Sequence, residues 1–285
     1  MKNHYNNLQN QTGATLIVLA VVLVLVSTSI FFSELNANNI KVARDKKTAA
    51  VLNEAKKALL SYASTVYIGA ACTSISSCRR PGDLPCPDLN NDGISDSCLG
   101  NALGRLPWVT LGLNDLRDGD NERLWYAVST NFKNNPRIGR LNSDTLGTIN
   151  VTNQNNKVVN NAVSSTGAVA VIISSGAPLT RQDGVQQSRS SLNQNLSTHY
   201  LDIALGEDNA NFVDSNANGF VKGVIRDLNG VVILNDQLME ISRIELLNAI
   251  EPRIAAEIKK AILDYYNVYH YYPYPAVFSD STCLG

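Results

Sequence analysis

The sequence predicts an α+β protein with a long N-terminal helix, a head of antiparallel strands and a second helical unit near the C-terminus. An uncharged apolar run covers residues 14–32, and sequence without Gly or Pro continues to Ala63. After residue 64, short β-rich runs alternate with Gly, Asn and Pro, which is typical of strands and loops. Helical spacing of apolar residues returns at Leu238. These features predict helix, then sheet, then helix.

The first helix is predicted to cross a membrane. At about 1.5 Å per residue the apolar run would span roughly 29 Å, close to the thickness of the hydrocarbon core. A secretory signal peptide has a shorter apolar run that ends at a cleavage site. Residues 33–63 keep apolar side chains at a three-to-four spacing, so one side of this continuation should lie on a folded domain. We therefore expect residues 14–63 to form one transmembrane and stalk helix.

Composition limits the partners and the compartment. The 285 residues contain 24 basic and 25 acidic side chains, a balance that argues against a nucleic-acid partner. The length allows one large or two ordinary domains. Five cysteines favour an oxidising, extracytoplasmic compartment.

The N-terminus resembles that of a known family. The leader MKNHYNNLQNQTG, the apolar ATLIVLAVVLVLV and the amphipathic continuation are similar to type IV prepilins and type II secretion pseudopilins over roughly the first 60 residues. The resemblance implies that a prepilin peptidase removes residues 1–13 by cutting between Gly13 and Ala14. It also implies an inner-membrane protein with its head in the periplasm. Other pilin or pseudopilin subunits would then pack against an assembly helix that includes Leu16, Ile17, Val18 and Leu19.

Two features depart from that family. Val18 stands at the fifth mature position, where the family usually has Glu, and this favours a minor subunit over a bulk fibre subunit. A basic cluster at Lys41–Lys47 follows the apolar run, whereas Lys2 precedes it. The positive-inside rule would favour the opposite orientation. We follow the resemblance and the cysteines, which place the head in the periplasm.

Residues 64–237 are predicted to form the α+β head. Its strand candidates are short and rich in β-branched or aromatic residues, and turn residues bound them. They are Arg123–Ser129, Gly147–Thr152, Ala168–Ser174 and Gly230–Leu234.

Residues 238–285 are predicted to form a second, incomplete helix-plus-loop unit. EIKKAILDYY at 257–266 matches EAKKALLSYA at 54–63, and YPYP at 272–275 answers LPCP at 84–87. Pro252 either kinks this helix or begins another one. Unrelated helices followed by Pro-rich turns are the alternative. Because the second copy stops before its strand-forming part, we expect the chain to be a fragment.

The cysteines indicate a disulfide framework. The simplest pairing joins Cys72 to Cys78 and Cys86 to Cys98, although these four residues allow three connectivities. Cys283 has no partner in this scheme. A zinc site is less favoured, because the chain has no C-x-x-C pair and only 3 His.

One acidic loop has the spacing of a calcium loop. Its oxygen ligands would come from alternate positions, with Gly93 at the sharp turn, but Leu99 stands where the usual bidentate Glu would be. The alternative is a metal-free turn, the interpretation we prefer for the similar DSNANGF at 214–220. The predicted calcium ligands are Asp88, Asn90, Asp92, the carbonyl of Ile94, and Asp96.

No catalytic residues are predicted. His199 is the one His in the body of the domain, and Ser174 and Ser175 follow a predicted strand without a G-x-S-x-G elbow. Phosphate-binding and dinucleotide motifs are absent from the sequence. The sequence thus favours a non-enzymatic minor pilin or pseudopilin-like subunit. The alternative is a signal-anchored periplasmic calcium-binding adhesin or hydrolase that does not polymerise.

Overall fold

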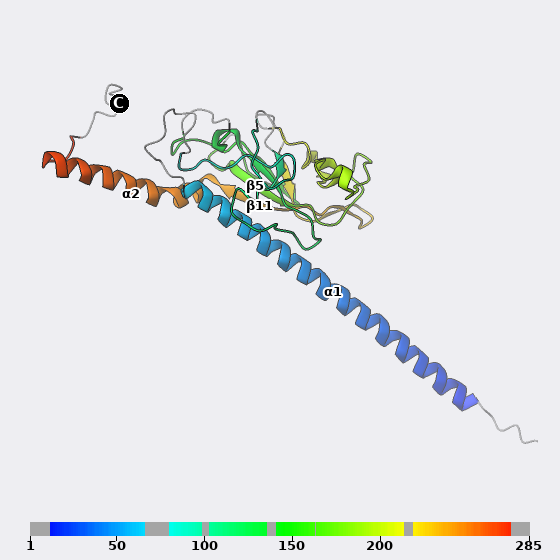
Figure 1. Cartoon of the computed structure of the whole chain (residues 1–285). Coiled ribbons are helices and arrows are strands. Elements are labelled where there is room, and N and C mark those ends of the chain that lie inside the picture. Colours follow the sequence, from blue (N-terminus) through cyan, green and yellow to red (C-terminus); the bar gives the residue numbers. More distant parts are fainter. Residues whose placement is uncertain are drawn as a thin grey trace, which may run out of the picture. The chain divides into compact units, whose positions relative to one another are not determined.

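The computed structural model describes residues 12–65, 80–98, 103–135, 141–162, 164–213 and 219–274. Two long helices, α1 (Thr12–Ser64) and α2 (Arg243–Tyr269), precede and follow a set of short strands (Figure 1). The chain divides into two compact units, Met1–Lys47 and Thr48–Gly285, so α1 contributes to both. Strands and helices are segregated along the chain, as in an α+β protein.

The main sheet has the strand order β1-β2-β5-β11, and every neighbouring pair is antiparallel. Its strands are β1 (Leu103–Arg105), β2 (Trp125–Val128), β5 (Ala168–Ser174) and β11 (Gln237–Ser242). The central strand β5 reads AVAVIIS and is buried along its whole length. Its apolar run is therefore explained by its place between β2 and β11.

Smaller sheets complete the head. Strands β3 and β8 pair in parallel, which departs from the predicted purely antiparallel head, whereas the other pairs are antiparallel. Short 3₁₀ turns η1 (Thr130–Phe132), η2 (Ser191–Asn193) and η3 (Ser197–His199) connect the strands. The strands of these sheets are β3 (Val151–Asn153), β4 (Val158–Asn160), β6 (Ile203–Ala204), β7 (Glu207–Asp208), β8 (Phe220–Lys222), β9 (Ile225–Arg226) and β10 (Val232–Leu234).

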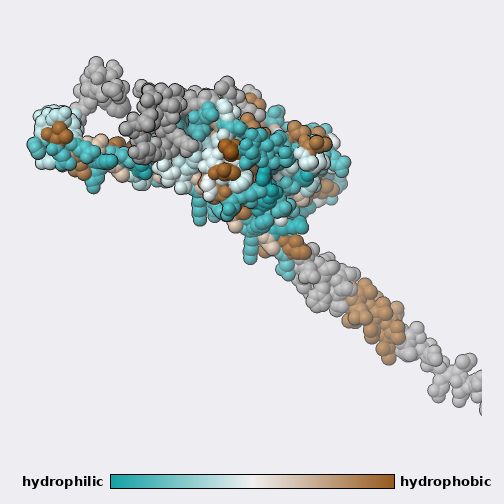
Figure 2. Space-filling view, viewed as in Figure 1, coloured by the Kyte–Doolittle hydropathy of each residue, from teal (hydrophilic) through white to brown (hydrophobic). Residues whose placement is uncertain are grey.

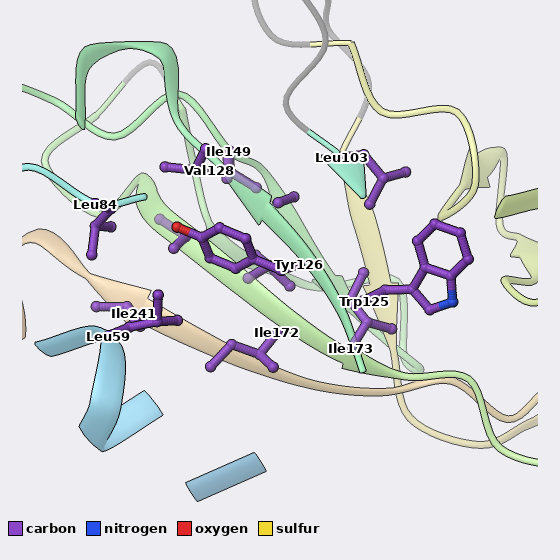
Figure 3. Close-up of a cluster of buried hydrophobic side chains, with 14 of the residues drawn as sticks. Leu59, Leu84, Leu103, Trp125, Tyr126, Val128, Ile149, Ile172, Ile173 and Ile241 are labelled. Atoms are coloured by element: carbon purple, nitrogen blue, oxygen red, sulfur yellow. The ribbon is translucent and has the colours of Figure 1, made fainter. Parts of the chain in front are cut away.

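The last part of α1 belongs to the core of the head. Leu52, Ala55, Leu59 and Ala63 recur at a spacing of three or four and are all buried. This spacing gives the helix a single apolar stripe. Figure 3 shows Leu59 beside Ile241 in the buried cluster of the main sheet. Burying each large apolar side chain stabilises the head by roughly 1.5–3 kcal/mol.

The predicted membrane-spanning segment is wrong. Among the described residues no helix is both long enough and apolar enough to cross a membrane. Part of the predicted span lies outside the described side chains. This finding corrects two predictions: the membrane-spanning part of the predicted fold, and the inner-membrane localisation with the head in the periplasm.

The boundary of the second helix also differs from the prediction. Residues from Leu238 to Ser242 form β11, paired with β5, and α2 begins only at Arg243. A capping box sets this start: the Ser242 hydroxyl accepts the backbone N–H of Glu245, and the Glu245 carboxylate accepts the N–H of Ser242. Pro252 lies inside one continuous helix.

Three of the four predicted strands are confirmed with changes in their ends, whereas Gly147–Thr152 shares only its last two residues with a strand. Ala168–Ser174 is β5 as predicted, and Arg123–Ser129 contains the shorter β2. Gly147–Thr152 overlaps β3, and Gly230–Leu234 contains β10.

Candidate functional site

The N-terminal part of α1 presents an unbroken apolar surface. The predicted assembly residues Leu16, Ile17, Val18 and Leu19 are 70%, 65%, 62% and 61% exposed. The run from Leu16 to Val26 contains only apolar residues, so every face of this helical stretch is hydrophobic. Figure 2 shows it as a brown stretch of α1. A helix that is apolar all round is normally covered by other molecules.

The predicted processing site adjoins this stretch. The backbones of Gly13 and Ala14 lie within α1, next to the helix start at Thr12. The side chain of Ala14 lies outside the described residues. Cleavage between Gly13 and Ala14 stays a prediction.

The predicted calcium loop is held by hydrogen bonds from its own backbone. Both carboxylate oxygens of the buried Asp88 are used: Oδ1 accepts the N–H of Asn91 at 2.6 Å, and Oδ2 accepts the N–H of Gly93 at 2.6 Å. Asn90 and Asp92 each accept the N–H two residues ahead, and Asp96 accepts the N–H of Leu89. These bonds account for the Asp and Asn residues as turn formers.

The same loop shows why calcium remains only a prediction. In the described part of the chain, no group of three or more His, Cys, Asp and Glu side chains is placed to hold a metal ion. Gly93 has φ +87°, and a Cβ there would lie 2.6 Å from the Trp108 ring. The glycine is therefore required by backbone conformation and packing, with or without an ion.

One of the two predicted disulfides is confirmed. Cys86 and Cys98 are bonded and buried, and they close the loop that contains Asp88–Asp96. Cys72, Cys78 and Cys283 lie outside the described residues, as do residues 214–218 of the second acidic turn. The Cys86–Cys98 bond is one of the two local pairings that the sequence predicted.

The residues considered for hydrolysis have different partners. Ser174 donates a 2.6 Å hydrogen bond to Oδ2 of the buried Asp118, whereas Nδ1 of His199 accepts the backbone N–H of Ser188. Neither contact joins the hydroxyl of Ser174 to His199. Absence of enzymatic activity stays a prediction.

A polar cavity in the head was missed by the sequence analysis. It has a volume of about 460 Å³, and its lining includes Arg105, Arg117, Arg123, Arg189 and Tyr200. β1 and β2 place Arg105 directly opposite Trp125. Tyr200 follows η3. The cavity is thus assembled from segments that are far apart in the sequence.

Arginine and aromatic side chains stack in alternation at this cavity. The Arg105 guanidinium lies 3.9 Å from the ring centre of Trp125 and 4.0 Å from that of Tyr200. Arg189 lies 4.3 Å from the Tyr200 ring centre. The aromatic faces stabilise the cations electrostatically where water is excluded. No sequence motif predicts this arrangement, because the residues that form it come from separate segments.

Burial shifts the ionisation of these groups. Desolvation lowers the pKa of Arg105 to about 10 and lowers the pKa of Arg189. It also raises the pKa of the Glu122 carboxyl, which lines the same cavity. The arginines nevertheless remain cationic at neutral pH.

No known protein-family model, curated protein or solved structure matches this chain. A functional interpretation therefore depends on the geometry of its own residues. The features available for it are the exposed apolar helix, the Asp88 loop and the arginine-lined cavity.

Proposed function

We propose that the chain is a minor pilin or pseudopilin-like subunit that assembles through the N-terminal part of α1. The observation that supports this most directly is the construction of α1 itself. Its first part exposes an all-apolar surface, and its last part is buried in an α+β head. A single helix of this kind can join a folded head to a bundle of equivalent helices.

The energetics favour packing between copies. Each large apolar side chain of the run would gain roughly 1.5–3 kcal/mol when moved from water into an apolar environment. Equivalent helices from neighbouring subunits offer the same surface, so their association buries both partners. Repetition of that contact from subunit to subunit generates a filament.

The sequence around Gly13 supports the same proposal. A prepilin peptidase would remove the leader and leave Ala14 as the first, methylated residue, as the family resemblance implies. Val18 at the fifth mature position would make this a minor component, placed in or at the tip of a type IV pilus or type II secretion pseudopilus.

Mass spectrometry of the N-terminus tests the processing step. Protein from cells with an active prepilin peptidase should begin at N-methylated Ala14, and protein from cells without it should retain Met1. Gly13→Leu should block cleavage, whereas Asn10→Leu, which introduces the same side chain elsewhere in the leader, should leave it intact. An uncut chain in the presence of the peptidase would refute the proposal and favour the non-polymerising calcium-binding alternative.

Assembly is tested by a matched pair of substitutions on α1. Leu19→Asp places a charge in the all-apolar run and should abolish recovery of the subunit with sheared filaments. Val42→Asp changes another exposed apolar residue, 51% exposed, outside that run and should retain recovery. Equal recovery of the two variants would contradict assembly through the run.

A further inference from the structure

The arginine-lined cavity has more positive than negative charge. Arg117 and Arg123 both pair with one carboxylate, that of Asp115, at 2.8 Å each. Arg105 pairs with no carboxylate in the described part of the chain. The carboxylate nearest to Arg189 is that of Glu122, whose Oε1 lies 3.8 Å from its Nε. Only two carboxylates therefore lie within ion-pair distance of the four guanidinium groups in the described part of the chain.

The surplus charge lies where water screens it poorly. Arg105 is 3% exposed, and its guanidinium donates to the backbone oxygens of Gln194 and Arg123. Buried charges without a counter-ion are unfavourable, and an anion brought to the site would relieve that cost.

Arg189 supplies an independent observation. Its buried Nε has no hydrogen-bond acceptor, although its terminal nitrogens donate to the backbone oxygens of His199 and Gly176. The guanidinium is thus held in position with one donor unused. A fixed guanidinium with an unused N–H can donate a charge-assisted hydrogen bond to an oxyanion.

The rest of the lining indicates the body of the ligand. Hydroxyl and amide groups surround the arginines, and the volume of about 460 Å³ is in the range of small-molecule sites. Such groups bind a hydroxylated body better than an apolar one. They belong to Asn91, Asn121, Ser190, Ser191 and Gln194.

We propose that this cavity binds a carboxylated sugar, with the carboxylate among the guanidinium groups and the hydroxyls on the amides and serines. Glu122 also lines the cavity, and its negative charge repels the carboxylate of the ligand and so limits the affinity for it. Removing its charge should therefore strengthen binding. This site is separate from the α1 surface proposed for assembly, so each proposal can fail without the other.

Isothermal titration with glucuronate, and with glucose as the uncharged control, tests the proposal. Glucuronate should bind and glucose should bind at least 10-fold more weakly. Arg117→Gln should weaken glucuronate binding by about 5–10-fold, because it removes a charge-assisted hydrogen bond. Arg226→Gln, whose terminal NH1 group donates to the carbonyl of Gly230, provides a charge-matched control and should bind like the wild type.

Glu122→Gln keeps the arginines and should strengthen glucuronate binding about 3–10-fold, so one variant is expected to gain affinity. No binding of glucuronate, or equal binding by the Arg117 and Arg226 variants, would overturn the proposal. Sulfate bound as tightly as glucuronate would overturn its sugar component.

Discussion

The last part of α1 and the second half of α2 share a sequence pattern but differ in burial. EAKKALLSYA in α1 buries Ala55 and Leu59 completely. In the matching EIKKAILDYY of α2, the equivalent Ile258 and Ile262 are 54% and 37% exposed. The difference shows that an amphipathic pattern specifies a helix and its apolar face without specifying what covers that face.

The covering element accounts for the contrast. In α1 the stripe lies in the core of the main sheet, where Leu59 is beside Ile241 of β11 (Figure 3). In α2 only Leu246 and Ile250, near its start, are buried.

Leu59→Ala should lower the free energy of unfolding by about 2–5 kcal/mol, because it leaves a cavity in a packed core. Ile262→Ala, at the equivalent position of α2, should change it by less than about 1 kcal/mol, since the side chain is already partly hydrated. Urea unfolding followed by tryptophan fluorescence measures both. Similar losses for the two variants would show that the α2 stripe is covered in solution.

Replacing both Cys86 and Cys98 by Ala should destabilise the head by about 3 kcal/mol, the loop-entropy value for a bridge of this length. Tyr274, which matches Cys86 in the second copy, is 89% exposed, so Tyr274→Ala should be nearly neutral. Thermal unfolding compares the variants, and reduced wild-type protein is a second control. A double variant as stable as the wild type would mean that the disulfide does not restrain the head.

The head also contains a buried carboxyl pair that should make its stability depend on pH. Asp202 and Asp236 are both 0% exposed, and the N–H of Asp202 donates to Oδ2 of Asp236 at 2.9 Å. Burial raises the pKa of Asp202 to about 6 and raises that of Asp236 strongly, with the charge of Asp202 as a further cause for Asp236.

A raised carboxyl pKa stabilises the folded state below the unfolded pKa, near 3.8 for Asp202, and that contribution is lost as pH rises through about 6. Asp236→Asn removes one of the two carboxyls with a raised pKa, so the stability of this variant should fall less than that of the wild type between pH 4 and 7. Urea unfolding across that range, taken as the difference between variant and wild type, cancels the other carboxylates. A difference that does not vary with pH would contradict the prediction.

The smallest effect is expected at the start of α2. Ser242→Ala removes the hydroxyl of the capping box and should cost about 1 kcal/mol. Asp264→Ala, further along the same helix, removes no capping contact and should stay within about 0.5 kcal/mol. Hydrogen exchange of the α2 amides should show faster exchange in the first turn of the Ser242 variant alone. Unchanged exchange there would mean that packing on β5 and β11 holds the turn without its cap.

Local patterns predicted the elements whose signals lie within a few residues. Both helices, the buried run of β5 and the Cys86–Cys98 bond were anticipated because periodicity, an apolar run and a short loop are each visible in one segment. For the Asp88 loop the sequence predicted calcium ligands and offered a metal-free turn as the alternative, because its Asp, Asn and Gly residues suit both.

Other features depended on contacts between distant segments. Leu238–Ser242 has a helix-like apolar spacing, yet pairing with β5 makes it a strand, because β5 offers a whole ladder of backbone hydrogen bonds. The membrane span was overpredicted because hydropathy over residues 14–32 was taken as sufficient.

The sequence did not predict the candidate cavity, because its lining residues come from distant segments. Pairing of β1 with β2 places Arg105 opposite Trp125, and η3 then brings in Tyr200 from much later in the chain. Arg105 and Arg189 become buried, and their pKa values shift, only when these segments pack together. Helices and turns depend on interactions between residues close in sequence, so the sequence pattern of one segment predicts them. Charge pairing, exposure and the cavity depend on packing between distant segments, which only the tertiary structure decides.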